Sequence, residues 1–88
     1  MLKDNKICAF LAVVEEGTFT RAARRLGVSQ PAVSAQIASL EAWIGRPLFE
    51  RGTVLTLTAA GETFLGYARR IQDAYDLTNK TFNNVFAK

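Results

Sequence analysis

Gln30 and Ser34 are the two residues of this 88-residue chain whose side chains are best suited to recognising a partner through hydrogen bonds. They are four residues apart, so a helix through them would place both on one face. The Gln30 amide can donate to and accept from an adenine base, and the Ser34 hydroxyl can do either. Pro31, Ala35 and Ala38 share that face, and their small uncharged side chains let a helix approach base edges closely. This combination suggests recognition of DNA bases in the major groove.

Two helices joined by a turn are needed to position this face. The first helix is indicated by apolar residues at helical spacing, which form one face: Phe19, Ala22, Ala23 and Leu26. The basic residues Arg21, Arg24 and Arg25 fall on the other side of this helix. Gly27 can adopt the left-handed conformation that ends a helix. Ser29 can cap the next helix, and Pro31 fits its first turn. Helix, short glycine-containing turn and helix is the spacing of the helix-turn-helix DNA reader.

The second of these helices also has a face suited to burial. Its apolar residues are spaced so that they form one stripe along the helix: Val33, Ile37, Leu40 and Ile44. Val28 precedes the helix and is expected to pack against the core. No Lys or Arg occurs between Leu26 and Gly45, so phosphate contacts are expected from flanking arginines: Arg21, Arg24, Arg25, Arg46 and Arg51. On this pattern alone, the alternative remains open that the polar residues are caps and solvated surface of a helical bundle.

The segments around this motif predict a mainly helical, winged helix-turn-helix domain over residues 1–58. A first helix over about residues 2–16 ends at Gly17, and either Thr18 or Thr20 can cap the helix that follows. The Gly-Arg-Pro sequence after the third helix stops it, because proline disfavours helical geometry in the residue before it. LFER and VLTLT then indicate a two-stranded hairpin, or wing, around a tight turn.

A long final helix is predicted over residues 59–88, with Thr58 as its cap. Its apolar residues alternate at spacings of three and four, which is typical of a helix that packs along a partner helix. At 1.5 Å per residue it would be roughly 40 Å long, more than the preceding body can cover. We therefore expect a homodimer with an interface that includes Phe64, Ala68, Ile71, Tyr75, Thr78 and Phe82. The alternative is that its first half packs on its own domain and its end frays.

The composition favours one small domain without catalytic chemistry. The formal net charge of +3 supports nucleic-acid binding only weakly. The chain has no His, and Cys8 is its only Cys, which excludes an internal disulfide and fits a reducing compartment. Neither a metal-ligand cluster nor a glycine-rich phosphate loop is apparent, so we expect no metal, no cofactor and no enzyme activity. Without a signal peptide or transmembrane segment, a cytoplasmic protein without membrane contact is expected.

The same residues resemble a known family over nearly the whole chain. The run AFLAVVEEGTFTRAARRLGVSQPAVSAQIASLEAWIGRPLFER, followed by LTLTAAGE, closely resembles the N-terminal winged helix-turn-helix domain of LysR-type bacterial transcriptional regulators. The resemblance implies a DNA-binding domain with a linker helix that dimerises, and tetramers in a full-length protein. It also implies a larger domain that binds a small-molecule inducer. That effector-binding domain is not within these 88 residues, so we expect an excised module or a truncated product.

The resemblance also implies which residues would contact DNA. The base-reading helix of the family falls on residues 29–36, which gives a DNA-facing set of Ser29, Gln30, Pro31, Ala32, Ser34, Ala35 and Gln36. Backbone contacts would come from the start of the preceding helix and from the wing: Thr18, Thr20 and Arg21, with Arg51, Gly52 and Thr53. Two departures stand out. Ala35 replaces the long polar side chain that many members carry, and the wing is one residue short and lacks a basic tip.

Two functions are compatible with these features. The first is a sequence-specific transcription regulator that binds a pseudo-palindromic operator as a dimer through the helix starting at Ser29. The alternative is a winged-helix protein-interaction module with weak or lost DNA affinity, which the neutral recognition helix and uncharged wing suggest. Salt-dependent binding to DNA separates the two.

Overall fold

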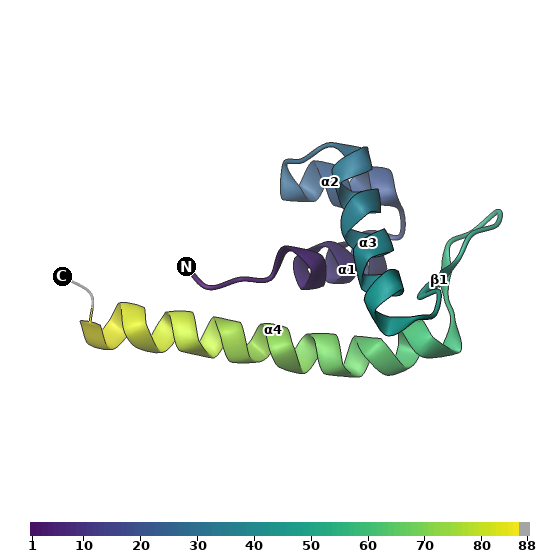
Figure 1. The fold of residues 1–88 in the computed structure, drawn as a ribbon. Helices are drawn as coiled ribbons and strands as arrows, with labels where there is room; N and C mark the ends of the chain where they lie inside the picture. The colour runs from purple at the N-terminus through teal and green to yellow at the C-terminus, as the bar shows by residue number, and fades with distance from the viewer. Residues whose placement is uncertain (87–88) are drawn as a thin grey trace.

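The computed structural model describes residues 1–86 and has the predicted mainly helical, winged arrangement (Figure 1). Its elements in chain order are α1 (Asn5–Glu16), α2 (Phe19–Leu26), α3 (Gln30–Ile44), β1 (Phe49–Glu50), β2 (Thr56–Leu57) and α4 (Ala59–Phe86). The first helix begins later than predicted. The Asp4 carboxylate accepts hydrogen bonds from the backbone amides of Lys6 and Ile7, so it caps α1 one residue before Asn5.

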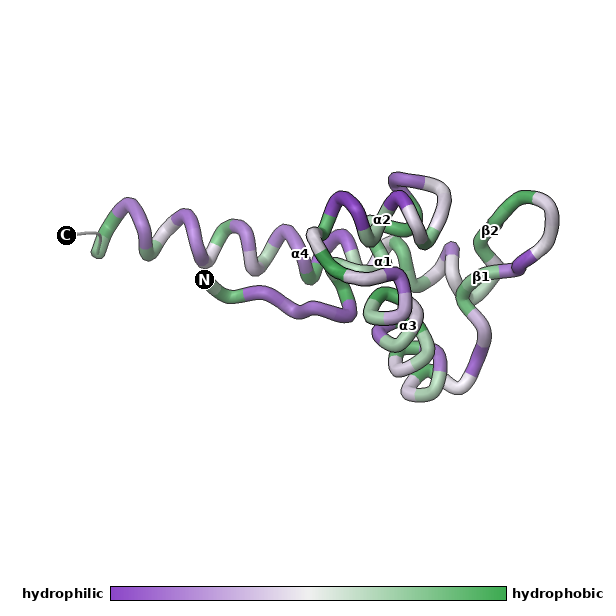
Figure 2. The backbone as a smooth tube through the Cα atoms, turned by 90° about the horizontal axis from the view of Figure 1, so that it is seen from above, coloured by the Kyte–Doolittle hydropathy of each residue, from purple (hydrophilic) through white to green (hydrophobic). Residues whose placement is uncertain are grey.

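The molecule is a small body of three helices and a hairpin at one end of a long helix. In Figure 1, α1, α2 and α3 lie over the first part of α4, and the wing projects beside them. The principal extents of 49 × 25 × 19 Å reflect the length of α4. Figure 2 shows the last turns of α4 extending beyond the body, with the N-terminal segment running beside them. The body therefore covers only part of the long helix.

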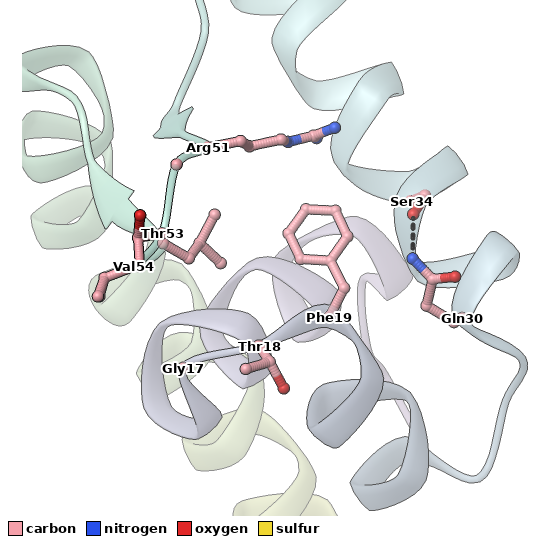
Figure 3. Close-up of a pocket in the computed structure, with 10 residues that line it drawn as sticks. Gly17, Thr18, Phe19, Gln30, Ser34, Arg51, Thr53 and Val54 are labelled. Atoms are coloured by element: carbon pink, nitrogen blue, oxygen red, sulfur yellow. Dashed lines mark hydrogen bonds between the residues drawn. The ribbon is translucent and has the colours of Figure 1, made fainter.

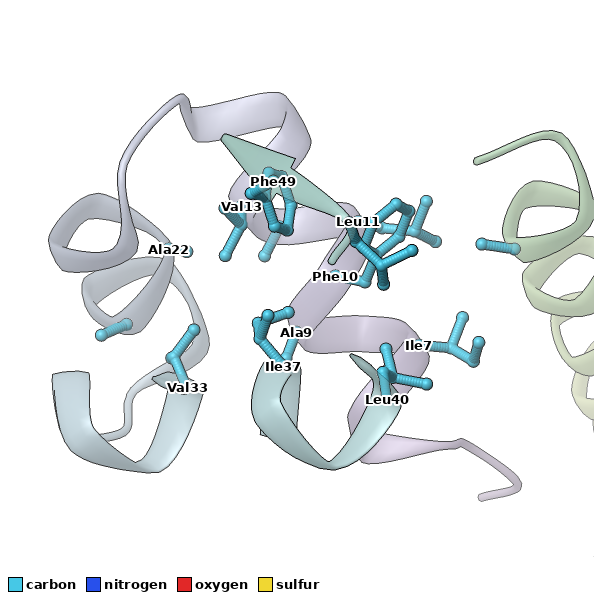
Figure 4. Packing of buried hydrophobic residues seen from close by; sticks show 14 residues of the cluster. Ile7, Ala9, Phe10, Leu11, Val13, Ala22, Val33, Ile37, Leu40 and Phe49 are labelled. Atoms are coloured by element: carbon cyan, nitrogen blue, oxygen red, sulfur yellow. The ribbon is translucent and has the colours of Figure 1, made fainter. Parts of the chain in front are cut away.

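Phe10 of α1 lies at the centre of the core (Figure 4). Its ring packs against Phe49 of β1, with centroids 5.4 Å apart, and edge-on against Phe64 of α4, at 5.0 Å. The largest of the fully buried side chains come from α1, α3 and the approach to the wing: Phe10, Val13, Val33, Ile37 and Leu48. This cluster joins the helix-turn-helix, the wing and the long helix into one packed unit.

The wing is a short antiparallel hairpin whose base is tied to α3 and α4. Phe49 pairs with Leu57 and Glu50 with Thr56. The Leu48 amide donates to the Glu41 carboxylate at 2.7 Å, while the Leu48 carbonyl accepts from the Thr58 amide at 3.0 Å. These contacts fix both ends of the hairpin, and the intervening residues 51–55 form its tip.

The first half of α4 packs on its own domain. Gly61 and Ala68 are buried there, and Phe64 is half-buried against the core. Ala68 has no exposed surface within the protomer and cannot offer any to a second copy, which corrects its assignment to the dimer interface. The reason is that α4 lies against α1, so the apolar stripe first faces its own helices.

Further along α4, Asn79 holds the N-terminal segment. Its side-chain amide donates to the Leu2 carbonyl at 2.7 Å, and its amide oxygen accepts from the Leu2 backbone N–H at 2.8 Å. The end of α4 is helical up to Phe86, and Phe82 and Phe86 stack with ring centroids 5.0 Å apart. No helix within residues 1–86 combines the length and apolar character needed to cross a membrane.

Replacing Gly61 with Ala tests the packing of α4 against the wing. A Cβ at Gly61 would collide with the Leu48 carbonyl oxygen and would meet Leu57 Cδ2 at 2.8 Å. We expect Gly61→Ala to lower the free energy of unfolding by about 1–3 kcal/mol, measured by urea denaturation. Gly66→Ala is the matched control, because its Cβ would meet open space, and it should raise stability by about 0.5–1 kcal/mol. Equal effects of the two substitutions would contradict this packing.

Candidate nucleic-acid interface

The start of α2, the start of α3 and the wing tip meet around one open groove of about 470 Å³ (Figure 3). Six residues predicted from sequence to contact DNA line it together: Thr18, Gln30, Ser34, Arg51, Gly52 and Thr53. They come from three separate segments of the chain, so the fold has assembled them. The groove is lined by two of the predicted base-reading residues, Gln30 and Ser34, and by four of the predicted backbone contacts.

The turn before α3 follows the predicted chemistry. Gly27 has φ +70° and ends α2 in the left-handed conformation, and the Val28 amide donates to the Ala23 carbonyl at 3.0 Å. The Ser29 hydroxyl accepts from the Ala32 amide at 3.2 Å and caps α3, with Pro31 in its first turn. Val28 itself is 48% exposed, which corrects its expected packing against the core. It lies in the turn, outside both helices, where neighbouring side chains cover only part of it.

The first two turns of α3 present a neutral face. Gln30, Pro31, Ala32 and Ala35 are exposed, and the Ser34 side chain is partly covered. Gln30 Nε2 donates a hydrogen bond to Ser34 Oγ at 3.3 Å, so the two side chains are paired across one helical turn (Figure 3). Both side chains also line the groove, so their polar groups lie beside it on the same face of α3.

Other predicted contacts lie outside this groove. Ala32 and Gln36 line a smaller hollow on another side of α3, beside Val28. Ser29, Pro31 and Ala35 belong to α3 and its cap without lining the groove, and Thr20 and Arg21 are exposed on the first turn of α2. Thr18 caps α2 by accepting from the Arg21 amide at 3.0 Å, which decides between the two predicted caps.

The arginines differ in whether a carboxylate engages them. Arg25 Nη1 lies 2.6 Å from Glu15 Oε1 and 3.5 Å from Glu16 Oε2, and the hydrogen bond to Glu15 is the main reason that the pKa of Arg25 is raised. Arg21 Nε lies 3.7 Å from Glu16. In the part of the chain that the structure describes, Arg24, Arg46 and Arg51 form no ion pair with a carboxylate. Among the five arginines predicted from the sequence to contact phosphates, Arg25 is therefore the least suited to neutralise one.

Arg51 has an aromatic partner instead. Its guanidinium carbon lies 4.8 Å from the centroid of the Phe19 ring, and Figure 3 shows the side chain extending from the wing above that ring toward α3. Sequence reasoning placed Phe19 in the core stripe of α2 and missed this contact. Nothing in the local pattern signals it, because the two residues come together only when the wing folds back beside α2.

Two further features of the described residues are the distribution of metal-binding side chains and the surroundings of Cys8. Among residues 1–86, no group of three or more His, Cys, Asp or Glu side chains could hold a metal ion. Cys8 is half-buried, and its Sγ lies 3.8 Å from Gln72 Oε1 on α4. The groove itself is lined by the polar side chains of Thr18, Gln30, Ser34 and Thr53 and by the charged side chain of Arg51.

The comparisons with known proteins agree with this interpretation. Residues 5–62 match the bacterial regulatory helix-turn-helix protein, lysR family. The chain is 46% identical over 80 residues to the HTH-type transcriptional regulator CbbR of Rhodospirillum rubrum, covering 90% of this chain and 27% of that protein. It is similar to the BenM DBD in complex with catB site 1 DNA, with a TM-score of 0.89, 33% identity and 99% of each chain covered. The CbnR DBD in complex with DNA gives a TM-score of 0.84 and 38% identity, covering 94% of this chain and 97% of that one.

The fold and the turn chemistry define a winged helix-turn-helix protein with a long C-terminal helix. The chain belongs to the LysR family of bacterial regulatory helix-turn-helix proteins. This confirms the resemblance drawn from the sequence and the prediction of a regulatory protein rather than an enzyme. The chain spans 27% of the length of the CbbR relative, well under two thirds.

Replacing Ser29 with Ala tests the cap that sets where α3 begins. The substitution removes the acceptor for the Ala32 amide, and we expect a loss of about 1 kcal/mol in the free energy of unfolding, measured by urea denaturation. Ser39→Ala changes the same residue type at an exposed position inside α3, where Ala is the better helix former. It should leave stability unchanged or raise it by up to about 0.5 kcal/mol. A neutral effect at Ser29 would contradict its role as the cap.

Proposed function

We propose that this chain is the DNA-binding part of a LysR-type transcriptional regulator and that it reads bases with the face of α3 that starts at Ser29. The observation that carries the proposal is the groove in which Gln30 and Ser34 meet Thr18 and the wing residue Arg51. A neutral helix face flanked by polar and basic groups suits a duplex, because base edges need hydrogen bonds and the backbone needs positive charge. The BenM and CbnR DNA-binding domains, which were solved in complex with DNA, are similar to this chain in fold and support DNA as its partner.

The two kinds of contact are proposed to be divided between elements. The residues of α3 and its cap face the bases, namely Ser29, Gln30, Pro31, Ala32, Ser34, Ala35 and Gln36. The start of α2 and the wing lie along the phosphates through Thr18, Thr20, Arg21, Arg51, Gly52 and Thr53. Because Ala35 offers no hydrogen bond, part of the specificity is proposed to come from the shape of the DNA.

Dimerisation through α4 is proposed for the part of its stripe that the protomer leaves uncovered. Ile71 is 38% exposed and, with half-buried Tyr75, lines an apolar groove of about 420 Å³ beside Trp43, which is 81% exposed. Thr78 and Phe82 continue the stripe, and Phe82 is well exposed. An apolar surface of this kind is typical of an interface, and a second copy would give two-fold symmetry to match a pseudo-palindromic operator. In a full-length protein, we propose that such dimers pair into tetramers and that a further domain binds a small-molecule inducer.

A protein-interaction module with weak or lost DNA affinity is the competing function. The neutral first turns of α3 and the tip residues 52–55, which carry no charge, favour it. It differs in a measurable way, because binding that depends on phosphate contacts weakens steeply as salt is raised.

Base reading by α3 predicts a selective loss of affinity. Gln30→Ala or Ser34→Ala should weaken binding to the specific site by about 1–3 kcal/mol and leave binding to unrelated duplex nearly unchanged. Fluorescence anisotropy with both duplexes measures this. Asn84→Ala, at an exposed position of α4 that lines neither groove, should change neither affinity. Equal losses on both duplexes would refute the base-reading role.

Phosphate contact by Arg51 predicts a uniform loss instead. Arg51→Ala should weaken binding to specific and unrelated duplexes to the same extent and should make the negative slope of log affinity against log salt shallower by about 0.9. Arg70→Ala is the matched control, because Arg70 lies over the Tyr67 ring of α4 at 5.7 Å and carries the same charge away from the groove. A loss confined to the specific duplex would contradict the phosphate assignment.

The proposed dimer predicts that a charge on the uncovered stripe separates the two copies. Ile71→Asp should shift the mass in solution from dimer to monomer, measured by sedimentation velocity, because it places a charge in the apolar groove beside Trp43. Leu77→Asp introduces the same charge at a position off the stripe that is 66% exposed, and it should leave the dimer intact. Monomers formed by the Leu77 variant alone would assign the interface to another face of α4.

A further inference from the structure

We propose that Phe19 is a positioning residue that holds the Arg51 guanidinium over the groove and thereby strengthens the contact of Arg51 with a DNA phosphate. This inference rests on the proposed function and adds a residue to it. The starting observation is the distance of 4.8 Å from the guanidinium carbon of Arg51 to the Phe19 ring centroid. That distance is within the range in which a cation is attracted to the face of an aromatic ring.

Arg51 needs such a partner because nothing else in its own segment fixes it. Strand β1 ends at Glu50, so Arg51 is the first residue beyond the hydrogen-bonded ladder of the wing. Its side chain is exposed, and the tip residues after it are small or uncharged. A long side chain at such a position samples many rotamers, and ordering it on binding costs conformational entropy. A ring that already holds the guanidinium in place reduces that cost.

Phe19 is itself rigidly supported. Its ring packs edge-on against Phe49 at 6.0 Å, Phe49 packs against Phe10 at 5.4 Å, and Phe10 packs against Phe64 at 5.0 Å. This row of four rings runs from α4 through α1 and β1 to the first residue of α2. Phe19 is half-buried at its outer end, so one side of the ring is anchored in the core and the other meets Arg51.

The choice of partner matters for phosphate binding. Arg25, held by Glu15 at 2.6 Å, has its charge compensated by a carboxylate. An aromatic ring orients a guanidinium without bringing a negative charge, so Arg51 keeps its positive charge available to a phosphate. Phe19 therefore orients Arg51 and leaves its charge uncompensated, whereas the charge of Arg25 is compensated by Glu15 at the end of α1.

A double-mutant cycle on the 88-residue chain tests this role. Affinity for an unrelated duplex would be measured across a salt series for the wild type, Phe19→Leu, Arg51→Ala and the double variant. We expect Phe19→Leu to weaken binding about two- to five-fold when Arg51 is present and to have no effect in the Arg51→Ala background. Phe19→Tyr, which keeps the aromatic face, should retain wild-type affinity. Thermal unfolding of each variant confirms that the folded protein is compared.

Additive losses, in which Phe19→Leu weakens binding equally with and without Arg51, would overturn the proposal and leave Phe19 a purely structural residue. NMR on the wild-type chain supplies a second measurement that does not depend on any variant folding. The Arg51 side-chain protons should be shifted upfield by the ring current of Phe19, and unshifted resonances would also overturn it. If the wild type bound no duplex at any salt, the proposed function would fail together with this role. Duplex binding by the wild type with an additive cycle would refute Phe19 alone.

Discussion

The packing of the Phe10 ring between Phe49 and Phe64 is the contact on which the other features depend. It brings α1, the first wing strand and α4 together at one point, with ring centroids 5.4 and 5.0 Å apart. The wing strands have only two residues each, so their own hydrogen bonds cannot orient the hairpin. The position of the wing relative to α3, and therefore the width of the groove, is set by this aromatic packing and by the ties of Leu48 to Glu41 and Thr58.

This arrangement separates two tasks that a DNA-binding surface must combine. The first turns of α3 carry no charge and offer hydrogen-bonding and small apolar groups, while the wing contributes Arg51, which has no carboxylate partner among residues 1–86. In the proposed function, sequence-selective contacts and charge-based contacts thus come from two different elements, α3 and the wing, which are tied to each other through Leu48 and Glu41. A substitution in one element can then alter specificity while leaving the charge contribution of the other intact.

Features with local causes could be predicted from the sequence, and those with distant causes could not. Gly27, Ser29 and Thr58 act on their immediate neighbours, so the turn and two caps were correctly predicted from residue type and spacing. The burial of Ala68 depends on where α4 lies against α1, and the stripe alone does not say whether it faces its own domain or a partner. The pairs Arg25–Glu15 and Arg51–Phe19 each join two separate elements, so the residue pattern within any one element cannot reveal them.

In the proposed function, α3 and the wing together read a DNA site. The most direct test is selection from a pool of random duplexes by this chain at two salt concentrations, followed by sequencing of the bound fraction. We expect enrichment of a two-fold symmetric motif, with an affinity that falls as salt rises. A bound fraction with no enriched motif, or binding that is indifferent to salt, would contradict it.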